Sequence, residues 1–234
     1  MSAGAGLAPL PFAPEAVLFD MDGLMLDSER AITRCYARAA AALGHDLPED
    51  YWLQMVGTGD AACRAMLVER LGQAQADALL QRSGAEYSAM VDAGIPHRPG
   101  ILALLQWLQE RGVPRAVATS TRNPLASHKL RQAGLLPYFP VVCTASDVAH
   151  PKPAPDVYLL AASRLGVEPA RCLVLEDSPA GVRAALAAGM TPIQVPDLVA
   201  PDAATRALGH RIAASLEQVL PLLQAVFDPV AAAD

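Results

Sequence analysis

The sequence predicts an α/β protein in which a doubly wound parallel sheet carries a small inserted α-helical domain. Five short, mostly apolar segments are the candidate strands, at residues 16–19, 113–118, 141–143, 172–175 and 192–195. They are apolar on both faces, as expected for strands that helices cover on both sides. Helical patterns alternate with these segments, and this alternation is typical of a parallel sheet between two helical layers.

The expected helices carry apolar residues at helical spacing and end at glycines. One such stripe is formed by Ile101, Leu104, Leu105 and Leu108. Gly112 follows this stripe as a C-terminal cap, and the next three helices end in the same way at Gly134, Gly166 and Gly189. Ser178 followed by Pro179 predicts the start of the last one, because serine caps free amides and proline tolerates the first helical position.

The segment between the first two strands has a different pattern. It is helical and rich in alanine, without a convincing strand, and it predicts a helical cap domain at residues 28–92. The α/β core domain then comprises residues 15–27 and 93–228, and residues 1–14 and 229–234 are expected to be loose termini. The insert would lie beside the C-terminal end of the first strand, where open α/β sheets bind ligands.

Composition excludes several classes of function. The net charge is -6, the pI is about 5.3, and neither lysine nor arginine forms a run, which argues against binding of nucleic acid or of an anionic membrane. The four cysteines are dispersed and predict neither a disulfide framework nor a zinc site. Without a basic leader segment or an apolar run of membrane-spanning length, a cytoplasmic location is expected.

Two carboxylates follow the first strand directly, in the segment Asp20-Met21-Asp22-Gly23. Residues two apart in an extended chain project to the same side, so both carboxylates can converge on one space. One can attack an electrophile while the other exchanges protons with the leaving group or with water. A simple turn after a strand is the alternative, and the tetrapeptide alone does not decide between them.

Three further polar segments follow predicted strands. Residues 119–123 (Thr-Ser-Thr-Arg-Asn) offer hydroxyls and amides to phosphate oxygens, Lys152 stands among prolines, and Glu176-Asp177 is a carboxylate pair suited to a hard divalent cation. Each alone has an ordinary explanation, respectively helix capping, a solvated lysine and an acidic helix N-terminus. Because all of them would meet at strand ends of one sheet, together they predict a site for a metal ion and a phosphate group.

These segments resemble the four motifs of the haloacid dehalogenase superfamily, specifically its phosphatase and phosphohexomutase branch with a helical cap after the first motif. The resemblance covers residues 17–196 and rests on DMDG at 20–23, the hydroxyl motif at Thr119, KPAPD from Lys152 and EDSPAG from Glu176. It implies a Rossmann-like core and a magnesium-dependent phosphatase that hydrolyses a small phosphomonoester through an aspartyl phosphate.

The resemblance also assigns roles to residues. Asp20 is the implied nucleophile, and Asp22 first protonates the leaving oxygen and then activates water. The implied Mg²⁺ ligands are the Asp20 carboxylate, the Asp22 carbonyl and Asp177, with Glu176 assisting directly or through water. The phosphoryl oxygens would be held by Thr119, the Ser120 amide and Lys152. Candidates for contacts with the leaving group are Thr58, Arg122 and Asn123.

Three alternatives remain beside the phosphatase. Dehalogenases of this family lack the acid/base residue that Asp22 provides. A phosphohexomutase of the β-phosphoglucomutase type shares all four motifs, but a known sugar mutase has an arginine where this chain has Asp60, and an acidic side chain would repel a second phosphate. A catalytically silent protein that binds a phosphorylated metabolite would require damaged motifs, and Asp20 and Asp22 are intact. The substrate stays open among sugar phosphates, nucleotides and glycolate-type phosphates, and a monomer is expected.

Overall fold

The computed structural model describes residues 7–228, together with all side chains in that range except that of Asp60, so the predicted loose ends at 1–6 and 229–234 lie outside the described residues. Residues 7–14 lie along the core instead of being loose. Leu10 is buried, and Arg211 donates hydrogen bonds to the carbonyls of Ala8 and Pro9. The predicted looseness therefore does not extend to this stretch.

Six parallel strands form one sheet in the order β3-β2-β1-β4-β5-β6. The strands are β1 (Ala16–Phe19), β2 (Arg115–Ala118), β3 (Val141–Cys143), β4 (Cys172–Glu176), β5 (Thr191–Gln194) and β6 (Arg211–Ile212). The doubly wound parallel sheet predicted from the sequence is confirmed. The short edge strand β6 was not predicted, because two residues are too few to give a periodic signal.

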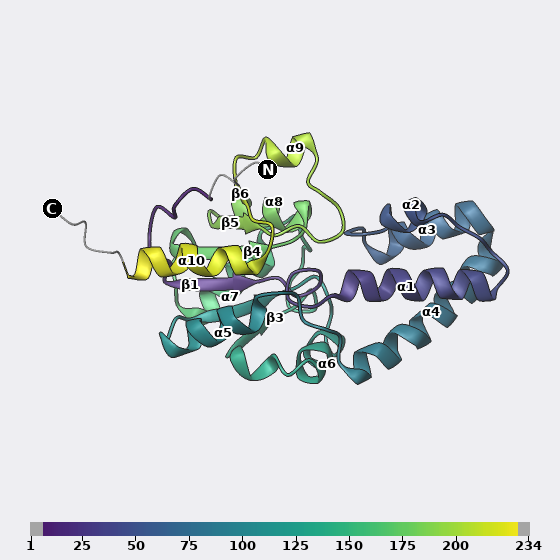
Figure 1. The fold of residues 1–234 in the computed structure, drawn as a ribbon, viewed down its shortest axis with the longest axis horizontal. Helices are drawn as coiled ribbons and strands as arrows, with labels where there is room; N and C mark the ends of the chain where they lie inside the picture. Colours follow the sequence, from purple (N-terminus) through teal and green to yellow (C-terminus); the bar gives the residue numbers. More distant parts are fainter. Residues whose placement is uncertain (1–6, 229–234) are drawn as a thin grey trace, which may run out of the picture.

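Helices cover both faces of the sheet (Figure 1). One face carries α5 (Ile101–Glu110), α6 (Leu125–Gln132) and α10 (Leu216–Phe227), and the other carries α7 (Asp156–Leu165) and α8 (Pro179–Ala187). In β1, Val17 and Phe19 point to the first layer, whereas Ala16 and Leu18 point to the second. This two-sided burial explains why the strand is apolar at every position.

Shorter elements connect the main ones. They are the 3-10 helices η1 (Leu136–Tyr138) and η2 (Pro169–Arg171) and the α-helix α9 (Ala203–Arg206). None of the helices in the described range is long and apolar enough to cross a bilayer.

Four helices occupy the segment between β1 and α5. They are α1 (Ser28–Ala42), α2 (Glu49–Leu53), α3 (Asp60–Leu71) and α4 (Gln73–Ala93), here called the helical insert. Figure 1 shows the insert extending to one side of the sheet. It has an apolar cluster of its own, which includes Trp52, Leu67 and Leu79, and it meets the core mainly where α4 packs on α6.

The strand order places a ligand site. The chain runs from β1 through β2 to β3 on one side of the sheet and then crosses back past β1 to β4, β5 and β6. The switch point therefore lies at the carboxyl ends of β1 and its neighbour β4. Asp20 follows β1 immediately, and its backbone amide donates to the Leu175 carbonyl of β4 at 3.0 Å. The motif carboxylates therefore stand at the position where doubly wound sheets bind ligands.

Candidate active site

Lys152 joins two of the predicted carboxylates. Its Nζ donates to Asp20 Oδ1 at 2.6 Å, to Glu176 Oε1 at 2.7 Å and to the Ala118 carbonyl at 2.9 Å. The lysine side chain is only 4% exposed. Burial alone would lower the pKa of Lys152, but the two carboxylates raise it well above its ordinary value, so the ammonium stays charged.

Glu176 is fully buried and both of its carboxylate oxygens are engaged by protein donors. Oε1 accepts from Lys152 and from the Tyr158 hydroxyl at 2.9 Å, while Oε2 accepts from the Ser178 amide at 2.8 Å and its hydroxyl at 3.0 Å. Burial opposes ionisation, yet Lys152 and these donors lower the pKa of Glu176. Four hydrogen bonds from protein donors therefore fix the orientation of this carboxylate.

Gly181 in α8 makes room for this carboxylate. A Cβ atom at Gly181 would lie 1.6 Å from Glu176 Oε1, so any side chain there must displace Glu176 from its donors. We expect Gly181→Ala to lower the free energy of unfolding by about 2 kcal/mol or more, because buried charges lose their hydrogen bonds. Catalytic turnover should fall as well, because Lys152 loses its second anchor.

The matched control for this substitution is Gly84→Ala in α4, where nothing lies within 4 Å of an added Cβ. In a helix interior this change should be neutral or stabilise by about 0.5–1 kcal/mol. Chemical denaturation and kcat of both variants provide the measurements. Equal behaviour of the two variants would contradict the steric role given to Gly181.

Asp177 faces the backbone turn of the first motif. A Cβ at Gly23, whose φ is +79°, would lie 2.2 Å from Asp177 Oδ2, so only glycine leaves space for this carboxylate. Burial raises the pKa of Asp177 well above its ordinary value, and the neighbouring charges of Glu176 and Asp20 raise it further. Burial likewise raises the pKa of Asp20 to about 7, although Lys152 opposes the shift.

This excess of negative charge fits a bound cation. Asp20 and Asp177 both follow strand ends at the switch point, and the charge of Asp20 raises the pKa of Asp177. Within residues 7–228, no group of three or more His, Cys, Asp or Glu side chains is arranged to hold a metal ion. An open site of one or two carboxylates, completed by water and phosphate oxygens, is the arrangement that Mg²⁺ commonly uses.

Asp22 has two partners on the segment that follows β2. Lys129 Nζ donates to Asp22 Oδ1 at 2.8 Å, and the Thr121 hydroxyl donates to Oδ2 at 2.6 Å. Burial would raise the pKa of Asp22, but these contacts lower it. Lys129 was missed by the sequence reasoning, because it lies inside a predicted helix and outside every motif.

The hydroxyl motif lies beside these groups at the end of β2. Thr119 is buried, and its Oγ1 accepts from the Thr121 amide at 3.0 Å. Ser120 and Arg122 are exposed on the same loop. Asn123 is exposed too, with its side-chain oxygen accepting from Ser127 at 2.8 Å.

The three predicted specificity residues are not drawn into the carboxylate cluster. Thr58 lies in the insert and donates to the Met55 carbonyl at 2.7 Å. Among the described residues, Thr58, Arg122 and Asn123 form no hydrogen bond or ion pair with Asp20 or Lys152. Their contact with a leaving group stays a prediction.

Glu29 is a further acidic residue that sequence reasoning missed. It lies in the first turn of α1, and burial together with the Asp22 charge raises its pKa to about 7. Acidic residues are common in the first turn of a helix, so its position gave no separate signal. Its charge also raises the pKa of Asp177, which places Glu29 at the edge of the same site.

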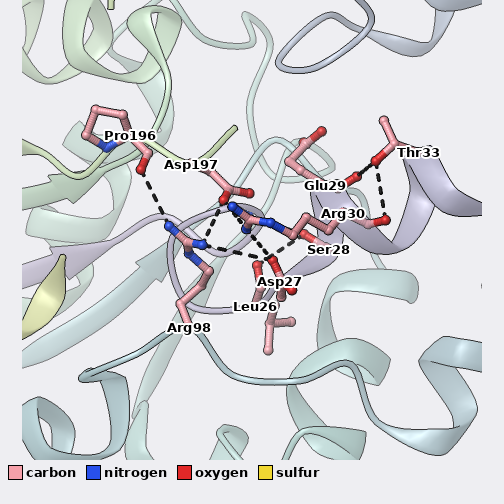
Figure 2. Close-up of polar contacts among 10 residues, drawn as sticks. Leu26, Asp27, Ser28, Glu29, Arg30, Thr33, Arg98, Pro196 and Asp197 are labelled. Carbon is pink, nitrogen blue, oxygen red and sulfur yellow. Dashed lines mark hydrogen bonds and ion pairs between the residues drawn. The ribbon is translucent and has the colours of Figure 1, made fainter. Parts of the chain in front are cut away.

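Both linkers of the insert are tied to the core, as Figure 2 shows. The Asp197 carboxylate, 1% exposed and located after β5, accepts from Arg30 of α1 and from Arg98 of the return linker. Arg30 also donates to Asp27 at 2.7 Å, and the Asp27 amide donates to the Pro96 carbonyl at 2.8 Å. These contacts hold the start of α1, and with it Glu29, beside the strand ends.

The fold and this site define an α/β protein with a ligand site of carboxylates and lysines at the switch point of a parallel sheet. A family model described as haloacid dehalogenase-like hydrolase matches residues 14–189. The chain belongs to the haloacid dehalogenase-like hydrolase family. The enzyme class predicted from the sequence, a phosphoric monoester hydrolase of this family, is confirmed by this match together with the relatives described next.

Similar proteins support this assignment. Hexitol phosphatase A of Escherichia coli (strain K12) is 38% identical over 179 residues, covering 76% of this chain and 81% of that protein. Fructose-1-phosphate phosphatase YqaB of the same organism is 35% identical over 183 residues, covering 76% and 95%. A solved HAD family hydrolase from Deinococcus radiodurans R1, with bound phosphate and sodium, has a TM-score of 0.77 and 32% identity, covering 92% of this chain and 97% of that one.

Proposed function

We propose that this protein is a magnesium-dependent phosphatase that hydrolyses a small phosphorylated carbohydrate through an aspartyl phosphate on Asp20. The observation that carries the proposal is the bridge formed by Lys152, which ties Asp20 to Glu176 at the switch point while Asp177 and Asp22 lie next to them. The names of the two E. coli relatives, which act on hexitol phosphates and fructose 1-phosphate, support a carbohydrate substrate.

In the proposed first half-reaction, an oxygen of Asp20 attacks phosphorus. The bond between phosphorus and the leaving oxygen breaks, and that oxygen takes a proton from Asp22. Lys152 neutralises one phosphoryl oxygen, and the Thr119 hydroxyl and the Ser120 amide orient the others. In the second half-reaction, Asp22 takes a proton from the attacking water.

Magnesium would be held by the Asp20 and Asp177 carboxylates and by the Asp22 backbone carbonyl. When bound, it offsets the repulsion between the acidic side chains and the phosphate. Glu176 in this proposal orients Lys152, in keeping with its four hydrogen bonds from protein donors.

We further propose that the helical insert is a cap domain on a core of residues 15–27 and 93–228. Water must be excluded while the substrate binds and must enter for the second half-reaction, so the cap has to move. Its linkers meet at the Asp197 cluster shown in Figure 2, which makes residues near Ser28 and Arg98 the expected hinge.

The test is a panel of phosphorylated hexoses, hexitols, nucleotides and glycolate-type acids with Mg²⁺, followed as release of inorganic phosphate. Release from a sugar or sugar alcohol phosphate is expected. Conversion of a sugar 1-phosphate to its 6-phosphate without phosphate release would instead select the phosphohexomutase. Absence of either reaction across the panel, with tight binding of a panel member, would favour the silent binding protein.

Removal of the metal should leave a protein whose stability falls as pH rises. Asp20, Glu29 and Asp177 have pKa values raised above the ordinary value of about 4. A carboxyl group with a raised pKa binds its proton more tightly in the folded chain, so its stabilisation is present at low pH and is lost as pH rises towards about 7. The melting temperature without metal should therefore fall between about pH 5 and pH 8.

Magnesium should reverse this trend, because it competes with protons for Asp20 and Asp177. We expect Mg²⁺ to raise the melting temperature more at pH 8 than at pH 5. Asp177→Asn should lose most of the Mg²⁺ effect and keep the part of the pH trend that comes from Asp20 and Glu29. Burial lowers the pKa of His210, so this histidine makes stability rise with pH. Its contribution is the same in wild type and in Asp177→Asn. A metal-free protein that becomes more stable from pH 5 to pH 8 would contradict the charge excess.

A further inference from the structure

The chain contains two lysines, and both lie in the candidate active site. All other basic side chains of its 18 Lys+Arg residues are arginines. Lys152 pairs with Asp20, and Lys129 pairs with Asp22, so each aspartate of the first motif has one lysine. Lys152 belongs to a motif of the family, whereas Lys129 does not, and its contact with Asp22 needs its own explanation.

Lys129 is built into the core and is covered by the insert. Its side chain is 5% exposed, between the buried Ala126 and Leu130 on the inner face of α6. The Tyr87 ring of α4 lies over the ammonium, with its centroid 5.1 Å from Nζ. Since α4 belongs to the insert and α6 to the core, Lys129 connects Asp22 to the contact between the two.

The hydrogen bonds hold Asp22 in one orientation. Lys129 takes Oδ1 and Thr121 takes Oδ2, and both partners are donors in these contacts. Each oxygen of Asp22 accepts one of these hydrogen bonds and keeps further lone pairs. The carboxylate can therefore still receive a proton while both donors hold it in place.

We infer that Lys129 is a positioning residue that holds Asp22 to accept the proton of the attacking water, and that Tyr87 couples this hold to the contact of the insert with the core. The inference rests on the proposed function. In that step a water oxygen bonds to phosphorus, the bond between phosphorus and Asp20 breaks, and its electron pair returns to the Asp20 carboxylate. The proton of the water passes to Asp22, which donates it to the leaving oxygen of the next substrate.

The rates of the two half-reactions distinguish a positioning role of Lys129 from a general effect on the fold. With p-nitrophenyl phosphate the leaving group needs no proton, so formation of the aspartyl phosphate does not depend on the orientation of Asp22. Hydrolysis of the aspartyl phosphate does depend on that orientation, because Asp22 must accept the proton of the water. Loss of Lys129 should therefore slow the second half-reaction and let the phosphoenzyme accumulate.

The test uses Lys129→Met in the full chain with Mg²⁺ and p-nitrophenyl phosphate, in rapid mixing with acid quench. We expect nitrophenol to form in the first turnover at a rate within about threefold of wild type, while steady-state turnover falls about 10- to 100-fold. Intact-mass measurement should show a larger phosphorylated fraction than in wild type. Lys129→Arg keeps the charge and should recover steady-state turnover to within about threefold of wild type.

Neighbouring substitutions provide the controls. His128→Ala removes the adjacent hydrogen bond between α6 and Asp92 of α4 and should change neither phase. Tyr87→Ala, which removes the ring over Nζ, should shift the two phases in the same sense as Lys129→Met but less. Thermal melting establishes that each variant is folded, and Tyr87→Ala tests the same split if Lys129→Met does not fold.

Different results would contradict the role of Lys129 and the proposed function. Equal slowing of both phases, or slow steady-state turnover without a larger phosphorylated fraction, would overturn the role of Lys129 alone. Full activity of Asp20→Asn would overturn the proposed function together with this inference.

Discussion

Asp20→Asn is expected to abolish phosphate release, with kcat lowered by at least about four orders of magnitude. The substitution replaces the attacking carboxylate with an amide of nearly the same size, which is a poor nucleophile. The fold should remain, because Lys152 keeps its contacts with Glu176 and the Ala118 carbonyl. Thermal stability near neutral pH should be equal or higher, since one of several crowded acidic charges is removed.

The measurement is release of inorganic phosphate by wild type and variant with the best substrate of the panel. Asp46→Asn, an exposed residue of the insert, is the matched control and should leave kcat unchanged. Wild-type rates of release from Asp20→Asn would show that phosphate does not pass through this aspartate.

Lys152→Met should cause the largest loss of stability. It leaves Asp20 and Glu176, both buried, without their shared cation. Breaking a buried ion pair by removing one partner costs about 3–5 kcal/mol, and we expect this loss in the free energy of unfolding near pH 8. Turnover should also fall by about 100-fold or more, because a phosphoryl oxygen loses its counter-charge.

The loss should shrink as pH falls. Without the lysine, each carboxyl group raises the pKa of the other, so protonation of the folded protein restores stability at low pH. Denaturant unfolding at about pH 5 and pH 8 measures this difference. A variant as stable as wild type at pH 8 would contradict the ion-pair account.

A double variant separates stability from catalysis. Lys152→Met with Glu176→Gln removes both the cation and one buried anion, so most of the lost stability should return. Activity should stay low, because the phosphate still lacks the ammonium. Recovery of both properties together would show that Lys152 acts through the fold alone.

Local patterns determined much of the architecture before any tertiary contact was considered. The apolar runs that became β1 and β3 were placed at their observed bounds, and α7 begins at Asp156 as predicted. Each of these segments carries its signal within a few consecutive residues. The sequence signals for β6 and α10 are weaker, because β6 is two residues long and α10 contains Pro221.

The four motifs were also evident in the sequence, because each is a compact run at the end of a strand. Asp20, Lys152 and Glu176 were nominated from such runs, and parallel strands bring their carboxyl ends to one edge of the sheet.

Sequence by itself determined the order of the strands along the chain, the family and the acidic and basic groups of the motifs. Tertiary structure alone decided which partners those groups have: Lys129 with Asp22, Tyr158 and Ser178 with Glu176, and the space at Gly181. The physical reason is that Lys129 and Tyr158 lie on helices remote in sequence from the carboxylates they contact, whereas Ser178 and Gly181 meet Glu176 only through the turn from β4 into α8. Their contacts depend on how α6, α7 and α8 pack on the sheet, and no periodicity of the residues encodes that packing.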